Sequence, residues 1–220
     1  MLKIAIVDDH LLFRKSLAHL VGSFSDVEVV FDGGNGQELL AFLRNNSIDL
    51  VLLDIEMPVL NGYQTCKILQ AEYPDVMILI ISQLTTRESI HEIMNLGAQG
   101  YFTKNSDPHQ LESALKSMSE NGFYFGMELG TVIREAILWE KKAARNYSSE
   151  VALTSRELEI IRLGSRGLGI VEIADLLHIS PRTVETQRNR LMSKTNSRNF
   201  IGAVLFALKT RQLTLEKLED

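Results

Sequence analysis

The chain has 220 residues, 45% of them hydrophobic, which is enough for one large domain or for two small domains with a core each. No apolar run approaches the roughly 18 residues of a membrane span, and the N-terminus lacks a signal-peptide pattern. We therefore expect no membrane partner and a cytoplasmic location. The single cysteine, Cys66, excludes a disulfide within the chain.

The net charge of −5 hides a difference between the two ends of the chain. Residues 1–121 contain 8 basic and 16 acidic residues, whereas residues 151–220 contain 11 basic and 8 acidic residues. An acidic part joined to a basic part indicates different partners for each, although ordinary variation between solvated surfaces would give the same balance.

The first 121 residues alternate short apolar runs with amphipathic stretches. The runs predicted as strands are Lys3–Val7, Val27–Phe31, Ile48–Leu53, Val76–Ile81 and Gly100–Thr103. The stretches predicted as helices are Leu11–Val21, Gln37–Arg44, Gly62–Glu72, Arg87–Leu96 and Pro108–Ser119. This order predicts an α/β domain, a parallel five-stranded sheet with helices on both faces. Residues 122–150 are predicted as a linker, with a loop or packing tail at Phe123–Gly126 and a helix at Glu128–Ala144.

Polar side chains follow four of the predicted strands. Asp8 and Asp9 follow the first strand, Asp54 the third, Ser82 the fourth and Lys104 the fifth. The carboxyl ends of parallel strands meet at one edge of a sheet, so these residues should converge. Converging carboxylates repel each other, and Mg²⁺ with oxygen ligands relieves that repulsion. A carboxylate beside the cation can attack a phosphoryl group, although any single strand-end aspartate is more often a cap or turn residue.

Four segments resemble the receiver domain of bacterial response regulators, from residue 1 to about residue 121. They are IVDD (6–9), LLDIEMPVLNG (52–62), IIS (80–82) and GYFTK (100–104). The resemblance implies a flavodoxin-like, doubly wound sheet. It also implies that Asp54 accepts a phosphoryl group and that Lys104 binds it. Asp9, Asp54 and the backbone carbonyl of Glu56 would hold Mg²⁺, and Asp8 would act through metal-bound water.

The same resemblance implies a switch and a phosphoryl donor. Ser82 and Tyr101 match the hydroxyl and aromatic pair that shift on phosphorylation, and a sensor histidine kinase would be the donor. One departure is visible, because Asn105 stands where many receivers have proline after the lysine. That departure concerns the local peptide geometry and does not affect the acceptor.

The last part of the chain, Val151–Leu215, has no strand pattern and is predicted to be helical. Thr154 and Glu157 form a capping box at the start of one helix, and Ile173–Leu177 is predicted as a second, short helix. Ser180 before a proline predicts the start of a third helix, Pro181–Lys194. Cations in and just beyond that helix are Arg182, Arg188, Arg190, Lys194 and Arg198. A polar helix after a tight turn suits the major groove of DNA, although a small helical bundle with a basic face fits the pattern equally well.

Two segments of this part resemble the LuxR/NarL-type helix-turn-helix, LTSRELEIIRL (153–163) and EIADLLHISPRTVETQRNRLMSKT (172–195). The resemblance implies that Glu185, Thr186 and Asn189 face base edges. It places three further residues near phosphates, namely Arg182, Thr183 and Lys194. The helix Phe200–Lys209 matches the family's dimer contact. Where the family commonly has Ser-Asn-Lys, this chain has Gly169-Ile170-Val171, which removes one phosphate-contacting lysine and offers apolar groups for packing against the receiver or a partner.

These observations predict a non-enzymatic transcription regulator with three parts: a receiver (1–121), a partly helical linker (122–150) and a LuxR-type helix-turn-helix domain (151–220). Phosphorylation of Asp54 would shift the receiver toward a homodimer that binds double-stranded DNA. Three alternatives remain open at this point. They are an orphan regulator that works without phosphorylation, a phosphatase using Asp54 as nucleophile with Glu56 nearby, and a C-terminal domain that binds protein.

Overall fold

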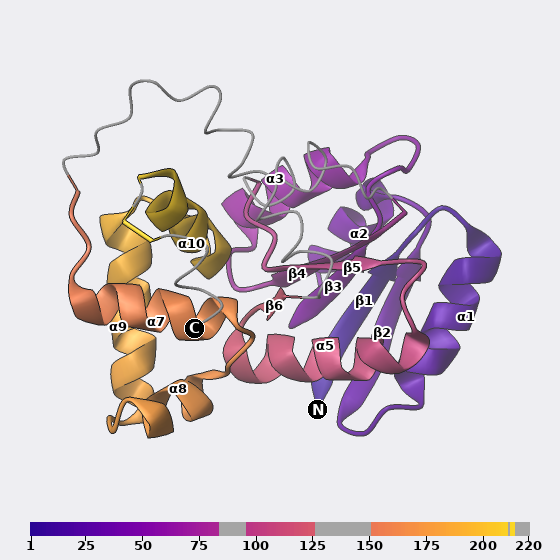
Figure 1. Cartoon of the computed structure of the whole chain (residues 1–220). Coiled ribbons are helices and arrows are strands. Elements are labelled where there is room, and N and C mark those ends of the chain that lie inside the picture. Colours follow the sequence, from indigo (N-terminus) through magenta and orange to yellow (C-terminus); the bar gives the residue numbers. More distant parts are fainter. Residues whose placement is uncertain (84–95, 126–150, 211, 214–220) are drawn as a thin grey trace. The chain divides into compact units, whose positions relative to one another are not determined.

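The computed structural model describes residues 1–83, 96–125, 151–210 and 212–213, in two compact units that divide after Tyr124 (Figure 1). The first unit is built on a sheet with the order β2-β1-β3-β4-β5-β6, in which neighbours from β2 to β5 pair in parallel. The predicted parallel α/β fold is confirmed. The strands are β1 (Leu2–Val7), β2 (Val27–Gly33), β3 (Leu50–Leu53), β4 (Met77–Ser82), β5 (Gly100–Thr103) and β6 (Tyr124–Phe125).

The sixth strand corrects the prediction of a loop or packing tail after residue 122. Its two residues lie at the sheet edge beside β5, where the backbone N–H of Tyr124 donates to the carbonyl oxygen of Gln99 at 3.2 Å. The Tyr124 ring also lies beside the ring of Phe102, with 6.4 Å between centroids. A strand of two residues has no alternating pattern to read, so only these contacts with distant residues define it.

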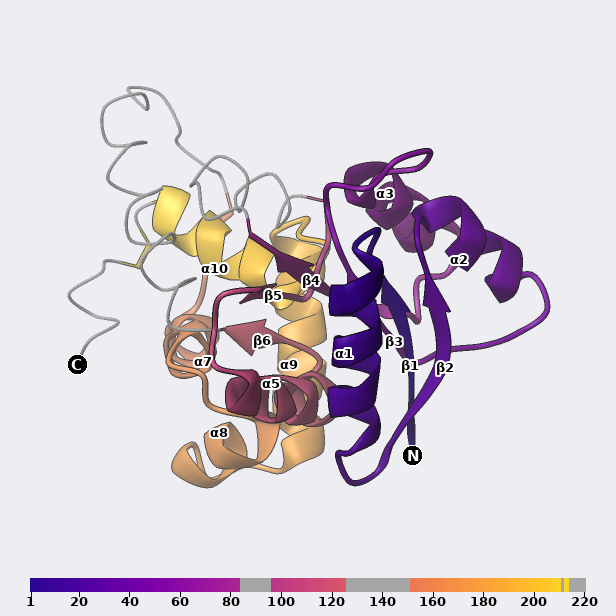
Figure 2. The same ribbon diagram turned by 90° about the vertical axis from the view of Figure 1, so that its right-hand side faces the viewer.

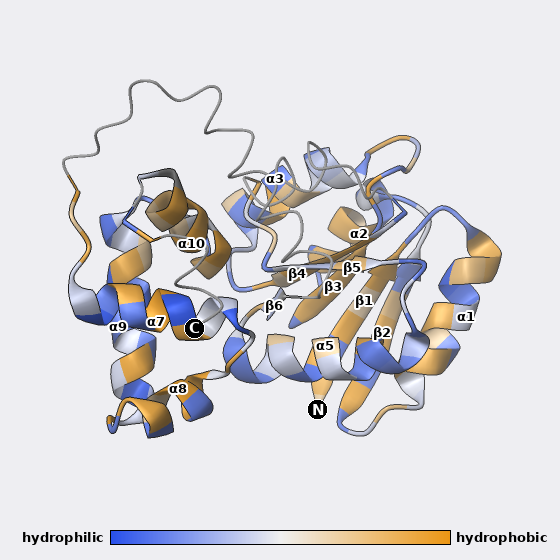
Figure 3. Ribbon diagram, viewed as in Figure 1, coloured by the Kyte–Doolittle hydropathy of each residue, from blue (hydrophilic) through white to orange (hydrophobic). Residues whose placement is uncertain are grey.

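Helices cover both faces of the sheet, as Figure 2 shows. On one face lie α1 (Leu11–Gly22) and α5 (Pro108–Asn121), whose apolar side chains pack on alternate residues of the strands. On the other lie α2 (Gly36–Leu43) and α3 (Gly62–Glu72). The central strands are hydrophobic along their length (Figure 3), as expected for strands buried on both faces. The helices predicted at Arg87–Leu96 and Glu128–Ala144 fall outside the described residues, apart from Leu96.

The register of the sheet brings the strand ends to one edge. Val7 at the end of β1 pairs with Leu53 at the end of β3, and Leu53 pairs with Ile80 in β4. At the far side, Ser82 pairs with Thr103 in β5. The polar residues at the ends of these strands therefore lie at the same edge of the sheet, as the sequence predicts for parallel strands.

The second unit is helical over its described residues. Its helices are α7 (Ser155–Ser165), α8 (Ile170–Leu176), α9 (Pro181–Lys194) and α10 (Phe200–Lys209). The predicted capping box at Thr154 and cap at Ser180 are both present. The start of α8 corrects the predicted start at Ile173. The backbone N–H of Gly169 donates to the Glu172 carboxylate at 2.7 Å, so Gly169 caps the helix, which begins three residues earlier, at Ile170. Among the described residues, no helix is long and apolar enough to cross a membrane.

Candidate functional site

Two buried carboxylates form the centre of the site at the sheet edge. Asp8 is 2% exposed and Asp54 is 3% exposed, and each directly follows its strand. The Asp54 backbone N–H donates to the carbonyl oxygen of Val7 at 2.9 Å, which continues the sheet to the acidic residues. The Asp54 carboxylate also accepts a hydrogen bond of 2.8 Å from the backbone N–H of Ile55, and this bond orients the carboxylate.

The ammonium of Lys104 lies between the two carboxylates. Its Nζ is 2.7 Å from Oδ2 of Asp8 and 2.9 Å from Oδ2 of Asp54, and the lysine side chain is only 7% exposed. Burial opposes the charge of Lys104, but the hydrogen bonds to the two carboxylates outweigh it, so the pKa of the ammonium is raised. For Asp54 burial prevails over the attraction of Lys104, and the pKa of this carboxyl is raised above its usual range.

Ser82 and Tyr101 are both buried on the neighbouring strands. Ser82 ends β4, and its carbonyl oxygen accepts the backbone N–H of Lys104 at 3.0 Å. Tyr101 lies in β5 opposite Ile80, with 1% of its surface exposed. The structure thus places the hydroxyl on β4, the strand beside the Asp54 strand β3, and the aromatic ring on β5, one strand further along the sheet.

The donor set of this edge fits a hard divalent cation. Asp8, Asp9, His10 and Asp54 each offer one ligand atom within 4.8 Å of the others. The Asp9 side chain is 32% exposed, so the cluster opens to solvent on one side. Carboxylate oxygens with an open side suit Mg²⁺, which keeps some of its waters. Glu56 lies in the loop after β3 with its side chain exposed, two residues beyond Asp54.

Three residues near this edge were not expected from the sequence. His10 Nδ1 is 3.0 Å from Asp9 Oδ1. Arg14 donates through Nη1 to the carbonyl oxygen of Asp8. The ring of Phe13 lies under Lys104, 4.8 Å from Nζ to the centroid. All three lie in or next to the first turn of α1. Their position in the sequence, directly after the acidic end of β1, is the pattern from which their place near the site could have been predicted.

The loop after Asp54 is held by a close backbone approach. Gly62 starts α3 behind a capping box formed by Asn61 and Gln64, and its N–H donates to the carbonyl oxygen of Ile55 at 2.9 Å. A Cβ atom on Gly62 would overlap the carbonyl oxygen of Asp54. Glycine at this position therefore allows the N-terminus of α3 to pack directly against the backbone of the turn that carries Asp54. No cis peptide bond occurs in the described chain, and Lys104–Asn105 is trans.

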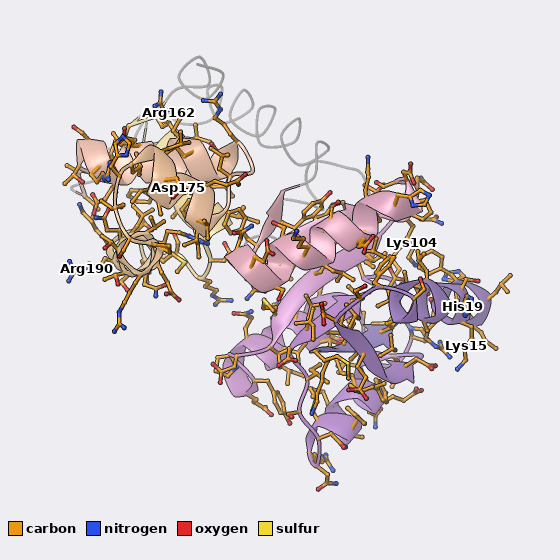
Figure 4. The ribbon with its side chains drawn as sticks, turned by 90° about the horizontal axis from the view of Figure 1, so that it is seen from below. Lys15, His19, Lys104, Arg162, Asp175 and Arg190 are labelled. Atoms are coloured by element: carbon orange, nitrogen blue, oxygen red, sulfur yellow. The ribbon has the colours of Figure 1, made fainter. Side chains whose placement is uncertain are left out.

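In the second unit, α9 presents the polar face that its pattern predicts. The exposed residues of this face are Arg182, Glu185, Thr186 and Asn189. Thr183 is half-buried and shares a hydrogen bond of 2.8 Å with the cap residue Ser180. Lys194 forms an ion pair of 2.7 Å with Glu157, so its ammonium already has a partner on α7. Arg190 lies at the surface of the unit (Figure 4).

Arg188 differs from the other cations of α9 because it is buried. It is 7% exposed, and its guanidinium lies 4.6 Å from the centroid of the Phe200 ring on α10. Burial lowers the pKa of Arg188 to about 10, with the nearby Glu185 acting in the opposite direction. Arg188 is therefore not one of the cations that α9 offers to a ligand at its exposed face. It lies on the same face of α9 as Val184 and Leu191, which are buried as well.

Comparison with known proteins places both units in established families. Residues 4–116 match the response regulator receiver domain, and residues 151–207 match the bacterial regulatory proteins of the luxR family. The oxygen regulatory protein NreC of Staphylococcus epidermidis is 31% identical over 216 residues, covering 96% of this chain and 99% of its own. The response regulator UvrY of Escherichia coli K12 is 28% identical over the full length of both chains.

Solved structures show the same folds. The response regulator ChrA of a heme-sensing two-component system aligns with a TM-score of 0.50 and 27% identity, covering 96% of this chain and 98% of its own. The RcsB response regulator in complex with DNA aligns with a TM-score of 0.58, covering 94% and 98%, and at 19% identity this shows the fold alone. The chain belongs to the response regulators that join a receiver domain to a LuxR-type helix-turn-helix domain. It is a DNA-binding regulator of transcription of that family.

Proposed function

We propose that a sensor histidine kinase phosphorylates Asp54 and that this modification controls DNA binding by residues 151–220. The observation that carries the proposal is the Lys104 ammonium held between two buried carboxylates, with a solvent-open acidic cluster beside it. An ion pair with a purely structural role would need only one carboxylate for the one ammonium. Two buried carboxylates facing a single ammonium leave a net negative charge, which a bound metal ion would balance. In this proposal residues 1–121 form the receiver, and residues 122–150 form the linker.

The transfer step uses the carboxylate of Asp54 as nucleophile. A carboxylate oxygen forms a bond to phosphorus, and the bond between phosphorus and the donor's imidazole nitrogen breaks, with the electron pair staying on that nitrogen. Mg²⁺ held by Asp9, Asp54 and the Glu56 carbonyl, with Asp8 reached through water, would screen the negative charges that meet there. Lys104, already 2.9 Å from Asp54, would then bind a phosphoryl oxygen. Ser82 would hydrogen-bond another phosphoryl oxygen, with Tyr101 moving alongside it.

The DNA-binding part of the proposal rests on the exposed face of α9. Glu185, Thr186 and Asn189 would read base edges in the major groove, where glutamate accepts from cytosine and asparagine pairs with adenine. Arg182, Thr183 and Lys194 would contact phosphates, which for Lys194 means exchanging Glu157 for the DNA backbone. RcsB has been solved as two dimers bound to two parallel DNAs, which supports a homodimer of this chain on DNA.

Treatment of the full chain with Mg²⁺ and acetyl phosphate tests the acceptor. We expect a mass increase of one phosphoryl group in the wild type and in Asp75→Asn, an exposed acid away from the pocket, but not in Asp54→Asn. Labelling that survives Asp54→Asn would refute the acceptor. Size-exclusion chromatography and DNA binding of the same samples should show a dimer that binds DNA more tightly when phosphorylated.

Two other results would point to different functions. Equal DNA affinity with and without labelling would favour an orphan regulator that works without phosphorylation. Many turnovers on phosphomonoesters would instead favour a phosphatase, whereas we expect one phosphoryl group per chain and slow release.

A further inference from the structure

Phe13 is an aromatic residue whose ring contacts Lys104, the lysine that is proposed to bind the phosphoryl group. It lies in the first turn of α1, and its ring centroid is 4.8 Å from Nζ of Lys104. The same ammonium is within 2.9 Å of both buried carboxylates. Lys104 is therefore held by two anionic oxygens and by the face of a ring, which attracts cations through its quadrupole.

The first turn of α1 is fixed to the strand ends, which gives the ring a defined place. Arg14 donates to the carbonyl oxygen of Asp8, and its Nε is 3.3 Å from Asp32 at the end of β2. Asp32 also pairs with Lys15 at 2.9 Å. The Phe13 ring itself packs against the core beneath α1 and α5. Figure 4 shows Lys104 in the region where these two helices approach each other.

The ring has two physical effects on Lys104. It takes the place of water on one side of the ammonium, which strengthens the ion pairs on the other side because the local dielectric falls. It also adds an attraction along the ring normal, so Nζ is held between the carboxylates and away from solvent. A leucine at position 13 would retain the first effect and lose the second.

We propose that Phe13 is a positioning residue for phosphoryl transfer: its ring holds the Lys104 ammonium where it meets the phosphoryl group on Asp54. The inference rests on the proposed function, because it concerns the same site. The ring touches neither the phosphoryl group nor Asp54, and it acts only through Lys104. Loss of its electrostatic contribution should slow phosphorylation and shorten the life of the acyl phosphate.

Site-specific fluorination of Phe13 in the full chain tests this with little change of shape. Wild type, 4-fluoro-, 3,5-difluoro- and pentafluoro-phenylalanine at position 13 are compared, because added fluorine removes the ring quadrupole stepwise. With Mg²⁺ and acetyl phosphate, we expect the rate of Asp54 labelling to fall with each step. The total loss should be about 2- to 30-fold, the range that such a contact is worth. Thermal unfolding should change little across the series.

Two further measurements complete the design. Phe13→Leu should show a similar loss of rate, whereas Leu12→Ala at the neighbouring, 83% exposed position should not. In the wild type, the NMR signals of the Lys104 Cε protons should be shifted upfield by the ring, and this shift should disappear in Phe13→Leu.

Each outcome separates the two proposals. A wild type that is not labelled on Asp54 refutes the proposed function. Normal labelling of the wild type with rates that stay constant across the fluorinated series refutes the role of Phe13 and leaves the proposed function intact. Absence of the upfield shift in the wild type refutes it as well, whether or not any variant folds.

Discussion

Replacing Lys104 by methionine removes the positive charge between Asp8 and Asp54 while nearly retaining the side-chain volume. The two carboxylates, 2% and 3% exposed, then face each other without a counter-charge in the absence of metal. Their ligand oxygens lie within 4.8 Å of each other, so at an effective dielectric of about 20 their repulsion is at least about 3.5 kcal/mol. Breaking a buried ion pair costs about 3 to 5 kcal/mol in general, and uptake of a proton by one carboxyl relieves part of that cost. We therefore expect Lys104→Met to lower the free energy of unfolding of the receiver by about 3 kcal/mol without metal.

Mg²⁺ should reverse much of this loss. In the wild type the metal would share its carboxylate ligands with the ammonium, whereas in Lys104→Met it would no longer compete with the ammonium for them. Binding should therefore be tighter in the variant, and a hundredfold excess over the dissociation constant stabilises by about 2.7 kcal/mol. The assay is urea unfolding of the full chain by circular dichroism, in EDTA and in MgCl₂. If the variant is as stable as the wild type in EDTA, or if Mg²⁺ stabilises both proteins equally, the electrostatic description of this site is wrong.

Three further predictions concern the turn behind the pocket and the helix-turn-helix domain. Gly62→Ala should destabilise the receiver by about 1 to 3 kcal/mol in urea unfolding, because the added Cβ would overlap the backbone carbonyl of Asp54. Gly22→Ala is the control and should stay near the wild-type stability, because a Cβ there meets nothing within 4 Å. Arg182→Ala should reduce the slope of log affinity against log salt in DNA binding by about 1, and Arg188→Met should leave that slope unchanged because its guanidinium is buried. Burial alone would raise the pKa of Glu157, but the hydrogen bonds that its carboxylate accepts outweigh burial and lower the pKa. The ionised Glu157 therefore contributes its full stabilisation above the ordinary pKa of 4.5, and this contribution is lost as the pH falls through the lowered pKa. Acid unfolding of Glu157→Gln should therefore show a smaller loss below pH 4.5 than wild type, and equal losses would contradict the assigned ion pair.

The helix-turn-helix part shows how far local patterns reach. The caps at Thr154 and Ser180 and the extent of α9 follow from short-range rules, because each involves a side chain and a backbone group three residues away. The start of α8 was predicted at Ile173, three residues too late. The Glu172 carboxylate accepts from the Gly169 N–H and makes Gly169 the helix cap. The burial of Arg188 depends on Phe200 in another helix, and no local rule indicates that contact.

The sequence by itself determined the alternation of strands and helices and the carboxylates at the strand ends, because strand polarity and helical spacing are local properties. It also indicated that Asp54 and Lys104 would share an edge, since parallel strands end together. Only the tertiary structure decided that Lys104 bridges two buried acids and that Phe13 lies beneath it. Those contacts join residues from separate strands and a helix, and their distances depend on how the helix packs on the sheet. The sheet edge was therefore predictable, whereas the environment of its cation was not.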